Sequence, residues 1–447
     1  MNTANSLSSN SSPAAEAGIA DKLDPQARAT ARKAAIAASA GTAIEYYEFG
    51  VYGYMAATIG PLFFPSTDAT ASLLAILAVF GSAFLMRPIG GIVLGRLGDR
   101  IGRRGILLVT VIGMGIATGL IGLLPTASTA GILAPLMLLL VRLVQGFFAG
   151  GEVTGAAAYV AECAPPGKRG FYGAFTPVGV AVGGAVAAAL CGITSVLLTP
   201  AQMAEWGWRI PFLLAIPMVL ISTAVRRRVE ESAAFQEFQA HNEPVKAPLR
   251  EVLTQHPGKI FKVMALAFGQ NVGYYVGLVF MNIYMTTYLK YDKTAIYWIM
   301  AAVGVTMAML MPFFGSLSDR WGRRPVLAIG FIGYMVLVWP MMFLMDQQSL
   351  PLAALAMFIM ALPLPIVQSV GYPTYAEQFP TKVRYTGMAF SINIGAILGG
   401  GVTPYLATSL MATTGNLKSP AFLLIAAAVL SLLALLTVHE TAKEKLA

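Results

Sequence analysis

Long apolar stretches recur along almost the whole of this 447-residue chain. A helix needs about 20 mainly apolar residues to cross a bilayer, whereas a strand of a membrane barrel is an alternating segment of about 10 residues. The spacing therefore predicts an all-α polytopic membrane protein with twelve transmembrane helices. The stretches lie near 34–62, 70–95, 105–125, 131–161, 170–198, 209–226, 260–289, 294–317, 326–345, 350–376, 386–412 and 419–438.

The composition also indicates a membrane protein. Hydrophobic residues make up 57% of the chain and charged residues only 11%, against roughly 25% charged residues in soluble domains. The net charge of +9 does not indicate a nucleic-acid surface, because the basic residues lie in short loops and not in one patch with interleaved aromatics. The two cysteines are not in a Cys-x-x-Cys arrangement, so we expect neither disulfides nor a metal site, and no cofactor.

The distribution of Lys and Arg predicts the orientation in the membrane. If both termini lie on one side, that side holds 24 of the 30 basic residues, and the opposite side holds four. Cytoplasmic loops of membrane proteins carry such an excess. We therefore expect both termini in the cytoplasm. The expected location is the plasma membrane, a bacterial inner membrane.

A single long polar interval, residues 227–258, divides the apolar stretches into six and six. We expect a disordered cytoplasmic tail over 1–33, an N-terminal bundle over 34–226, a cytoplasmic linker over 227–259, a C-terminal bundle over 260–439 and a short tail over 440–447. The linker is predicted to carry a short amphipathic helix around Glu230–Gln239.

Two motifs recur at matching positions of the two sets. Gly-x-x-x-Asp-Arg-x-Gly-Arg-Arg begins at Gly95 and again at Gly315, an offset of 220 residues, with Leu-x-Asp-Arg common to both copies. Glu-x-x-Pro-x-x-x-Arg begins at Glu162 and at Glu377, an offset of 215. A duplicated six-helix unit explains both, so we predict two pseudo-symmetric six-helix bundles, an arrangement that underlies alternating-access transporters.

The charges of these motifs predict a contact between the halves on the cytoplasmic face. Carboxylates beside Arg pairs at helix ends can form charge-assisted hydrogen bonds that close in one state and open in another. The alternative is that these charges only set the orientation. The predicted latch residues are Asp99, Arg100, Arg103, Arg104, Glu162, Arg169, Asp319, Arg320, Arg323, Arg324, Glu377 and Arg384.

With the first motif, several strings in the predicted helices resemble those of the major facilitator superfamily and its metabolite:proton symporter branch. They lie at Gly41–Phe49, Phe84–Gly91, Arg142–Gly146, Gly150–Glu152 and Glu205–Phe212. The resemblance implies two six-helix bundles that take up a small polar solute together with a proton. One departure is that Tyr46 and Glu48 stand where the branch usually has Trp and Asp.

The branch includes permeases for 2-oxoglutarate, citrate, shikimate, and proline or betaine. We therefore expect uptake of an organic acid first, and a proline/betaine-type solute as the alternative. A proton-antiport exporter is less favoured, because the fifth stretch, residues 175–184, lacks the Gly-Pro pair of such relatives. An enzyme is not expected, since His-Glu-x-x-His and phosphate-binding glycine motifs are absent from the sequence.

Five charged residues lie well inside the apolar stretches, away from their ends, and all are in the first half: Glu45, Glu48, Arg87, Arg142 and Glu152. A charge at that depth costs about 2.5–3.5 kcal/mol on insertion scales and therefore needs a role. Glu45 and Glu48 share a helix face, and two carboxylates removed from water together resist ionising together. We predict Glu45, Glu48 and Glu152 for proton coupling, with ion pairs to Arg87 or Arg142 as the structural alternative.

A buried guanidinium can also hold a substrate carboxylate in a bidentate manner. Arg142 and Gln145 share one helix face, and the second half adds neutral polar groups that can hydrogen-bond to the solute. Arg87 is expected to snorkel toward the cytoplasm or join the latch. The small solute, the proton and the lipid bilayer are the expected partners, and a monomer suffices. The predicted substrate-binding residues are Tyr46, Arg142, Gln145, Asn271, Tyr274, Tyr275, Gln368, Tyr372 and Asn393.

Overall fold

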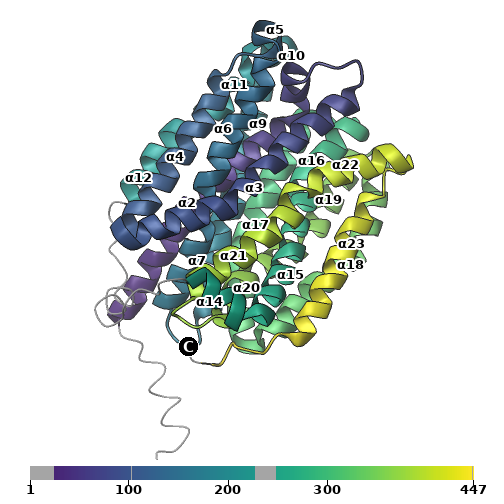
Figure 1. Cartoon of the computed structure of the whole chain (residues 1–447). Coiled ribbons are helices and arrows are strands. Elements are labelled where there is room, and N and C mark those ends of the chain that lie inside the picture. The colour runs from purple at the N-terminus through teal and green to yellow at the C-terminus, as the bar shows by residue number, and fades with distance from the viewer. Residues whose placement is uncertain (1–24, 102, 227–247, 445, 447) are drawn as a thin grey trace, which may run out of the picture.

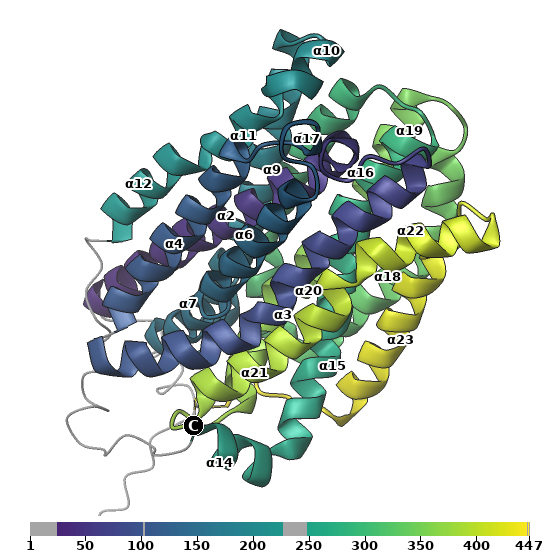
Figure 2. The same cartoon turned by 45° about the horizontal axis from the view of Figure 1, so that its top comes forward.

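The computed structural model describes residues 25–101, 103–226, 248–444 and 446. Its elements are long helices that run side by side (Figure 1), and a second view from another angle shows the same arrangement (Figure 2). Helices of the first half, coloured purple to teal, lie beside helices of the second half, coloured green to yellow. The site discussed below lies where these two sets meet.

The helices of the first half follow the predicted apolar stretches, with breaks at glycine and near loops. They are α2 Pro25–Phe63, α3 Ala69–Ile101, α4 Arg103–Leu123, α5 Ala127–Ala130, α6 Leu133–Ala149, α7 Glu152–Cys163, α8 Arg169–Gly173, α9 Phe175–Leu197, α10 Pro200–Gln202, the π-helical turn Met203–Gly207, α11 Arg209–Leu213 and α12 Ala215–Arg226.

The second half has a similar series, in which wider π-helical turns interrupt two of the rods. Such turns are frequent at functional sites. The elements are α14 Pro248–Gln255, α15 Pro257–Tyr274, the π turn Tyr275–Phe280, α16 Met281–Ile283, the π turn Tyr284–Tyr288, α17 Lys293–Trp321, α18 Arg323–Met345, α19 Leu350–Ala361, α20 Pro363–Gln378, α21 Arg384–Ala396, the π turn Ile397–Gly401, α22 Thr403–Thr414 and α23 Pro420–Thr437.

The described helices confirm an all-helical membrane architecture. Nine of the described helices are long and apolar enough to cross a bilayer, and the bent pair Pro200–Gly207 with Arg209–Ala224 makes a tenth. Two less apolar rods complete the predicted series. They are α2, which carries two buried glutamates, and α4, whose apolar part is Leu108–Leu123.

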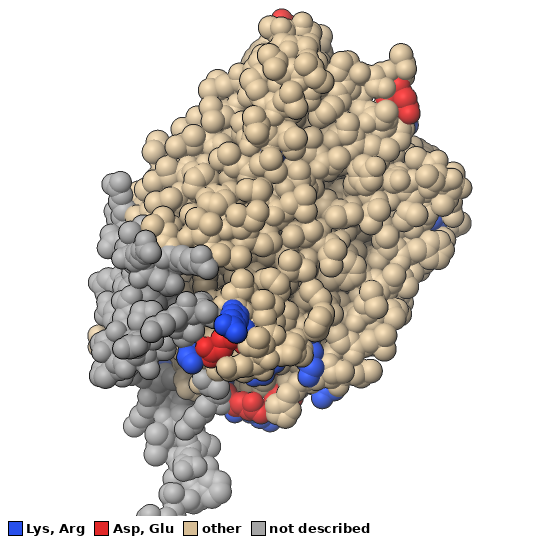
Figure 3. Space-filling view, in the orientation of Figure 1, with Lys and Arg blue, Asp and Glu red and all other residues tan. Residues whose placement is uncertain are grey.

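The outer surface is suited to lipid. Large apolar side chains point outward along the rods, for example Ile132 and Met309, each 75% exposed, and Leu197, 73% exposed. Figure 3 shows that uncharged residues cover most of the visible face and that most of the visible charged side chains gather at one end of it. A bilayer can cover such a band, because apolar groups there lose nothing by leaving water.

The first rod begins earlier than expected. Residues 25–33 were predicted as part of the tail, yet α2 begins at Pro25, where a proline suits the first turn of a helix. Ala34 and Ala38 are buried against Ala156 and Val160 of α7. The rod therefore continues past the apolar stretch, because another helix packs on its small residues.

The linker and the C-terminal tail also differ from the expectation. The helix predicted around Glu230–Gln239 lies outside the described residues, and the described helix α14 instead occupies the end of the linker. Glu440 and Thr441, which were predicted to belong to a short tail, instead hydrogen-bond to α18 and α20. The chain end is thus docked on the second half.

Candidate substrate and proton site

The fourth membrane rod is interrupted at Gly150 and Gly151, between α6 and α7. The backbone there lies directly against α3. A Cβ on Gly150 would be 2.0 Å from the carbonyl oxygen of Arg87, and one on Gly146 would be 1.8 Å from that of Ala83. Glycine is needed at both positions, since only its missing side chain lets the two backbones approach so closely.

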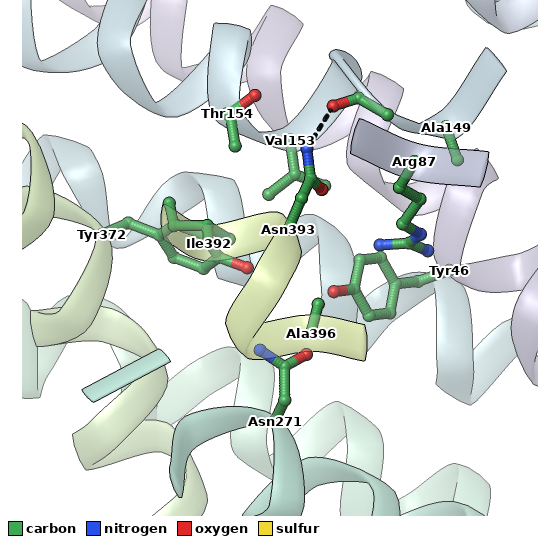
Figure 4. Close-up of a pocket in the computed structure, with 11 residues that line it drawn as sticks. Tyr46, Arg87, Ala149, Val153, Thr154, Asn271, Tyr372, Ile392, Asn393 and Ala396 are labelled. Atoms are coloured by element: carbon green, nitrogen blue, oxygen red, sulfur yellow. Dashed lines mark hydrogen bonds between the residues drawn. The ribbon is translucent and has the colours of Figure 1, made fainter. Parts of the chain in front are cut away.

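The interruption is where the second half reaches the first. The Asn393 side-chain amide on α21 donates a hydrogen bond of 2.8 Å to the Gly150 carbonyl oxygen, and the Tyr385 hydroxyl donates one of 3.4 Å to that of Gly151. Figure 4 shows the Asn393 bond as a dashed line. A broken helix with carbonyls directed at a partner bundle is a feature of transporter binding sites.

A small cavity lies beside this contact, between the two halves (Figure 4). It holds about 10 Å³, which is the room that roughly one water molecule needs. Solutes the size of an amino acid do not fit in this conformation. The cavity is lined by Tyr46, Arg87, Ala149, Gly150, Val153, Thr154, Asn271, Tyr372, Ile392, Asn393 and Ala396.

Four of the predicted substrate-binding residues line the cavity, and they come from four different helices. Tyr46 is on α2, Asn271 on α15, and Tyr372 and Asn393 on α20 and α21. Tyr274 is next to them, because its ring meets that of Tyr46 edge-on at 5.3 Å. Both halves therefore supply polar and aromatic groups to one small space.

Arg87 is a lining residue that the sequence interpretation missed. It was expected to snorkel or join the latch, but its side chain is only 5% exposed and its Nη2 lies 3.1 Å from Oε1 of Glu45. Its guanidinium also faces the rings of Phe49 and Phe84, at 4.5 and 4.4 Å. The aromatic neighbours and the carboxylate hold it inside the protein. Its pair with Glu45 is the structural alternative that was left open for the buried glutamates.

Glu48, one helical turn after Glu45, belongs to a different cluster. The Gln145 amide nitrogen donates hydrogen bonds to Glu48 Oε2 (3.3 Å) and Thr118 Oγ1 (2.6 Å). The Arg142 guanidinium donates to the amide oxygen of the same Gln145. Gln145 thus connects a buried carboxylate with a buried guanidinium, both within the first half.

This cluster changes the interpretation of Arg142. The structure does not place Arg142 or Gln145 at the cavity. The Arg142 guanidinium instead donates to the Phe80 carbonyl oxygen (3.2 Å) and lies over the Tyr52 ring at 4.2 Å. Packing among the helices of the first half encloses the guanidinium, so a substrate contact by Arg142 has no support here.

The remaining predicted site residues lie elsewhere in the bundle. Glu152 accepts a hydrogen bond of 3.0 Å from Thr110, and Gln368 accepts one of 2.7 Å from Gln270. The Tyr275 ring packs at 5.5 Å from Phe84 and 5.1 Å from Tyr274. None of these three predicted residues belongs to the cavity lining of the described structure.

The repeated Glu-x-x-Pro-x-x-x-Arg motifs pair with each other across the halves. Arg169 of the first copy lies 3.0 Å from Glu377 of the second, and Arg384 of the second lies 3.3 Å from Glu162 of the first. Glu377 also pairs with Arg323, at 2.9 Å. The four residues were predicted as one set, and the structure brings them together in two reciprocal pairs.

Asp319 joins the same contact from the second copy of the other motif. Its carboxylate accepts hydrogen bonds from the backbone N–H groups of Gly170 (2.7 Å) and Phe171 (2.9 Å) and pairs with Arg323 (2.9 Å). Gly322, with a φ of 104°, makes the turn between α17 and α18 that positions Arg323. In the left-handed region such a turn favours glycine.

The other members of the two motifs take less part. Arg320 is exposed, and Arg324 donates to the Leu436 carbonyl oxygen at 3.2 Å. The side chains of Asp99, Arg100, Arg103 and Arg104 lie outside the described part of the structure. The first copy of the loop motif therefore stays a prediction.

The docked chain end completes this region. Glu440 accepts hydrogen bonds from the backbone N–H groups of Arg323 (2.8 Å) and Arg324 (3.0 Å), at the start of α18. Burial alone would raise the pKa of Glu440, but these N–H donors and the Arg323 charge outweigh it, so the pKa lies below its usual value. Thr441 donates to Glu377 at 2.6 Å.

Comparisons with known proteins agree with this architecture. The family model of the sugar (and other) transporters matches residues 33–255, and that of the major facilitator superfamily matches residues 263–447. The fold is similar to that of the solved proton:xylose symporter XylE, with a TM-score of 0.73, 18% identity, and coverage of 94% of this chain and 98% of that one.

Two relatives from Escherichia coli (strain K12) are similar over nearly the whole chain. A proline/betaine transporter is 37% identical over 424 residues, which is 93% of this chain and 85% of the relative. A shikimate transporter is 36% identical over 416 residues, 92% of this chain and 95% of the relative. These are transporters and not enzymes, as the sequence predicted. The chain belongs to the major facilitator superfamily, in the metabolite:proton symporter branch to which these relatives belong.

Proposed function

We propose that this protein is a proton-coupled symporter for a small zwitterionic solute of the proline or betaine type. The observation that carries the proposal is the buried cavity between the halves, where Arg87, paired with Glu45, meets tyrosine and asparagine side chains. One positive and one negative group beside one cavity match the two charges of a zwitterion. The proline/betaine relative supports this choice, which was the alternative at the sequence level.

Charge balance favours a zwitterion over an organic acid. The Glu45–Arg87 pair is neutral as a unit, and a zwitterion adds no net charge to a space of low dielectric. An organic anion adds one negative charge, which needs a proton or a further cation as compensation. An organic acid, which was the main expectation from the sequence, is therefore the second candidate. Because a shikimate transporter is among the relatives, shikimate is included in the test.

The proton is proposed to bind at Glu48. The carboxylate is buried, it accepts a hydrogen bond from Gln145, and Gln145 links it to Arg142. Protonation of Glu48 would change the hydrogen bonds of Gln145 and thereby the packing inside the first half. Glu152 is a further candidate for proton coupling, because it too is buried in the first half.

Transport is proposed to proceed by alternating access. The latch pairs Arg169–Glu377 and Arg384–Glu162 join the halves at one end. At the other end the Tyr297 hydroxyl donates to the Tyr54 carbonyl oxygen at 3.2 Å. With both ends joined and a cavity of about 10 Å³ between them, the structure corresponds to a closed state. We propose that the latch end faces the cytoplasm, as the basic residues predict, in a bacterial inner membrane, and that a monomer suffices.

The test is uptake into proteoliposomes under an imposed pH gradient, acidic outside. Radiolabelled proline, glycine betaine and shikimate are offered separately to the wild type and to Glu48→Gln. We expect the gradient to drive accumulation of proline or glycine betaine in the wild type, and Glu48→Gln to exchange solute without accumulating it. Accumulation that is unaffected by the gradient, or that is confined to shikimate, would overturn the proposal.

A further inference from the structure

We propose, resting on the proposed function, that Glu45 and Arg87 are the two groups that bind the charges of the solute, and that they pair with each other until the solute arrives. On entry the pair separates. Arg87 then binds the solute carboxylate, and Glu45, together with neighbouring tyrosine rings, binds the ammonium group. This assigns Glu45 to solute recognition and leaves proton coupling to Glu48.

The position of Arg87 supports the first part. It lines the cavity, and its Nε makes no hydrogen bond to any described residue although the side chain is buried. A buried donor without an acceptor is costly and indicates a missing partner. A carboxylate in the cavity can supply that acceptor, because guanidinium binds carboxylate through two parallel N–H groups.

The surroundings of Glu45 support the second part. Tyr46, the next residue on α2, lines the cavity, and its ring meets Tyr274 at 5.3 Å. Tyr274 in turn meets Tyr275 at 5.1 Å, and Tyr372 lines the cavity from α20. A methylated ammonium has no N–H to donate, so aromatic rings and a carboxylate are the groups that can hold it.

The exchange also explains why two charges persist at a place where each is costly. While the cavity is small, the ion pair at 3.1 Å balances the two charges, although the Nε of Arg87 still lacks an acceptor among the described residues. When the solute lies between them, four alternating charges replace two, and neither protein charge is left unpaired. A solute with only one of the two charges would leave Glu45 or Arg87 without a partner.

Glu45 and Glu48 are therefore expected to differ in role although they are one turn apart. Glu45 pairs with a residue of the cavity, whereas Glu48 bonds to Gln145 within the first half. Neutralising Glu45 should remove recognition of the ammonium group and leave proton binding in place. Neutralising Glu48 should do the reverse.

The experiment uses three probes of nearly the same shape. Glycine betaine carries both charges, choline lacks the carboxylate, and tert-butylacetate replaces the quaternary nitrogen by carbon. Binding to the purified full-length protein in detergent is measured by isothermal titration calorimetry. The wild type should bind glycine betaine at least about tenfold more tightly than either single-charge probe, since each charge loses its partner when one is missing.

Two variants separate the two charges. In Glu45→Gln the preference for glycine betaine over tert-butylacetate should disappear, because the protein no longer distinguishes quaternary nitrogen from carbon. In Arg87→Gln the preference for glycine betaine over choline should disappear. Glu251→Gln removes an ion pair with Lys382 outside the cavity lining; it is the matched control and should keep the wild-type order of the three probes.

Folding is controlled with the double variant Glu45→Gln, Arg87→Gln. It leaves no unpaired buried charge, so it should fold even where a single variant does not, and it should bind all three probes within about threefold of one another. Wild-type discrimination in the double variant or in Glu45→Gln would overturn the inference and leave the proposed function standing. If the wild type neither binds nor transports glycine betaine or proline, the proposed function itself fails.

Discussion

Arg169 and Glu377 lie 3.0 Å apart across the boundary between the two halves, with side chains only 5% and 1% exposed. Their counterparts Arg384 and Glu162 form the reciprocal pair at 3.3 Å. Each copy of one duplicated motif therefore supplies the arginine for the glutamate of the other copy. In the proposed alternating-access cycle, opening this end of the molecule requires both pairs to separate.

Removing a latch carboxylate should therefore favour opening. Glu377→Gln leaves Arg169 and Arg323 with a neutral partner in a buried place, which costs roughly 3–5 kcal/mol for a buried pair. The expected result is faster maleimide labelling of Cys163, the residue after Glu162, in a Cys191→Ala background. The matched control is Glu251→Gln, which removes a pair with Lys382 in which the lysine is 57% and the glutamate 18% exposed. It should change the rate little, since pairs near the surface contribute at most about 1 kcal/mol. Equal labelling rates in both variants would show that the latch pairs do not hold this end closed.

The docked chain end should respond to pH through Glu440. Its pKa lies below the usual 4.5 in the folded protein, so the contribution of its carboxylate to stability is complete above the unfolded pKa. That contribution is lost as the pH falls through the folded pKa. We expect the difference in Tm between the wild type and Glu440→Gln to stay constant from about pH 8 to about pH 5 and to shrink at lower pH. A difference that shrinks instead above pH 6 would contradict this assignment.

Gly150 should not tolerate a side chain. In Gly150→Ala the new Cβ would meet the Arg87 carbonyl oxygen at 2.0 Å, so α3 and α6 must separate, at a cost of about 1–3 kcal/mol or more. We expect a lower Tm and loss of solute binding at the neighbouring cavity. Gly258→Ala is the control, because nothing lies within 4 Å of its added Cβ, and it should behave as the wild type. Unchanged binding in Gly150→Ala would show that the close approach of the two helices is not needed.

Gln145 is expected to connect the proton site with the buried arginine. Gln145→Leu removes its amide contacts, to Glu48 and Thr118 and from Arg142, and leaves two buried charges less well bonded. The expected result is loss of pH-driven accumulation, with solute counterflow retained to within about threefold. Gln368→Leu, a buried glutamine of the second half that bonds only to Gln270 among the described residues, is the comparison and should keep its response to the gradient. Normal accumulation in Gln145→Leu would remove Gln145 from the coupling proposal.

Much of the architecture was predictable because it follows from local rules. The long apolar stretches predicted helices that cross a membrane, and the described rods match nearly all of them. The two repeated motifs identified Asp319, Arg323, Glu377 and Arg169 as one set before their distances were known. Charged residues inside apolar stretches identified Glu45, Arg87 and Arg142 as unusual, since lipid makes each of them costly.

The partners of these charges were less predictable. Glu45 and Glu48 share a helix face, which suggested one shared site, but α3 presents Arg87 to the first and α6 presents Gln145 to the second. Arg142 was expected at the substrate, and neighbouring helices enclose it in aromatic rings instead. These outcomes depend on which helix packs against which, and sequence spacing along one helix does not contain that information.

The order of residues along the chain thus determined the membrane class, the duplication and the presence of a few costly buried charges, because apolar length and motif repetition are properties of the sequence alone. The tertiary structure alone decided that Arg87 pairs with Glu45 at the cavity and that Gly150 accepts a hydrogen bond from Asn393. The reason is physical: such pairs join helices distant in sequence, and only the close packing of those helices fixes which charges meet and which are held apart.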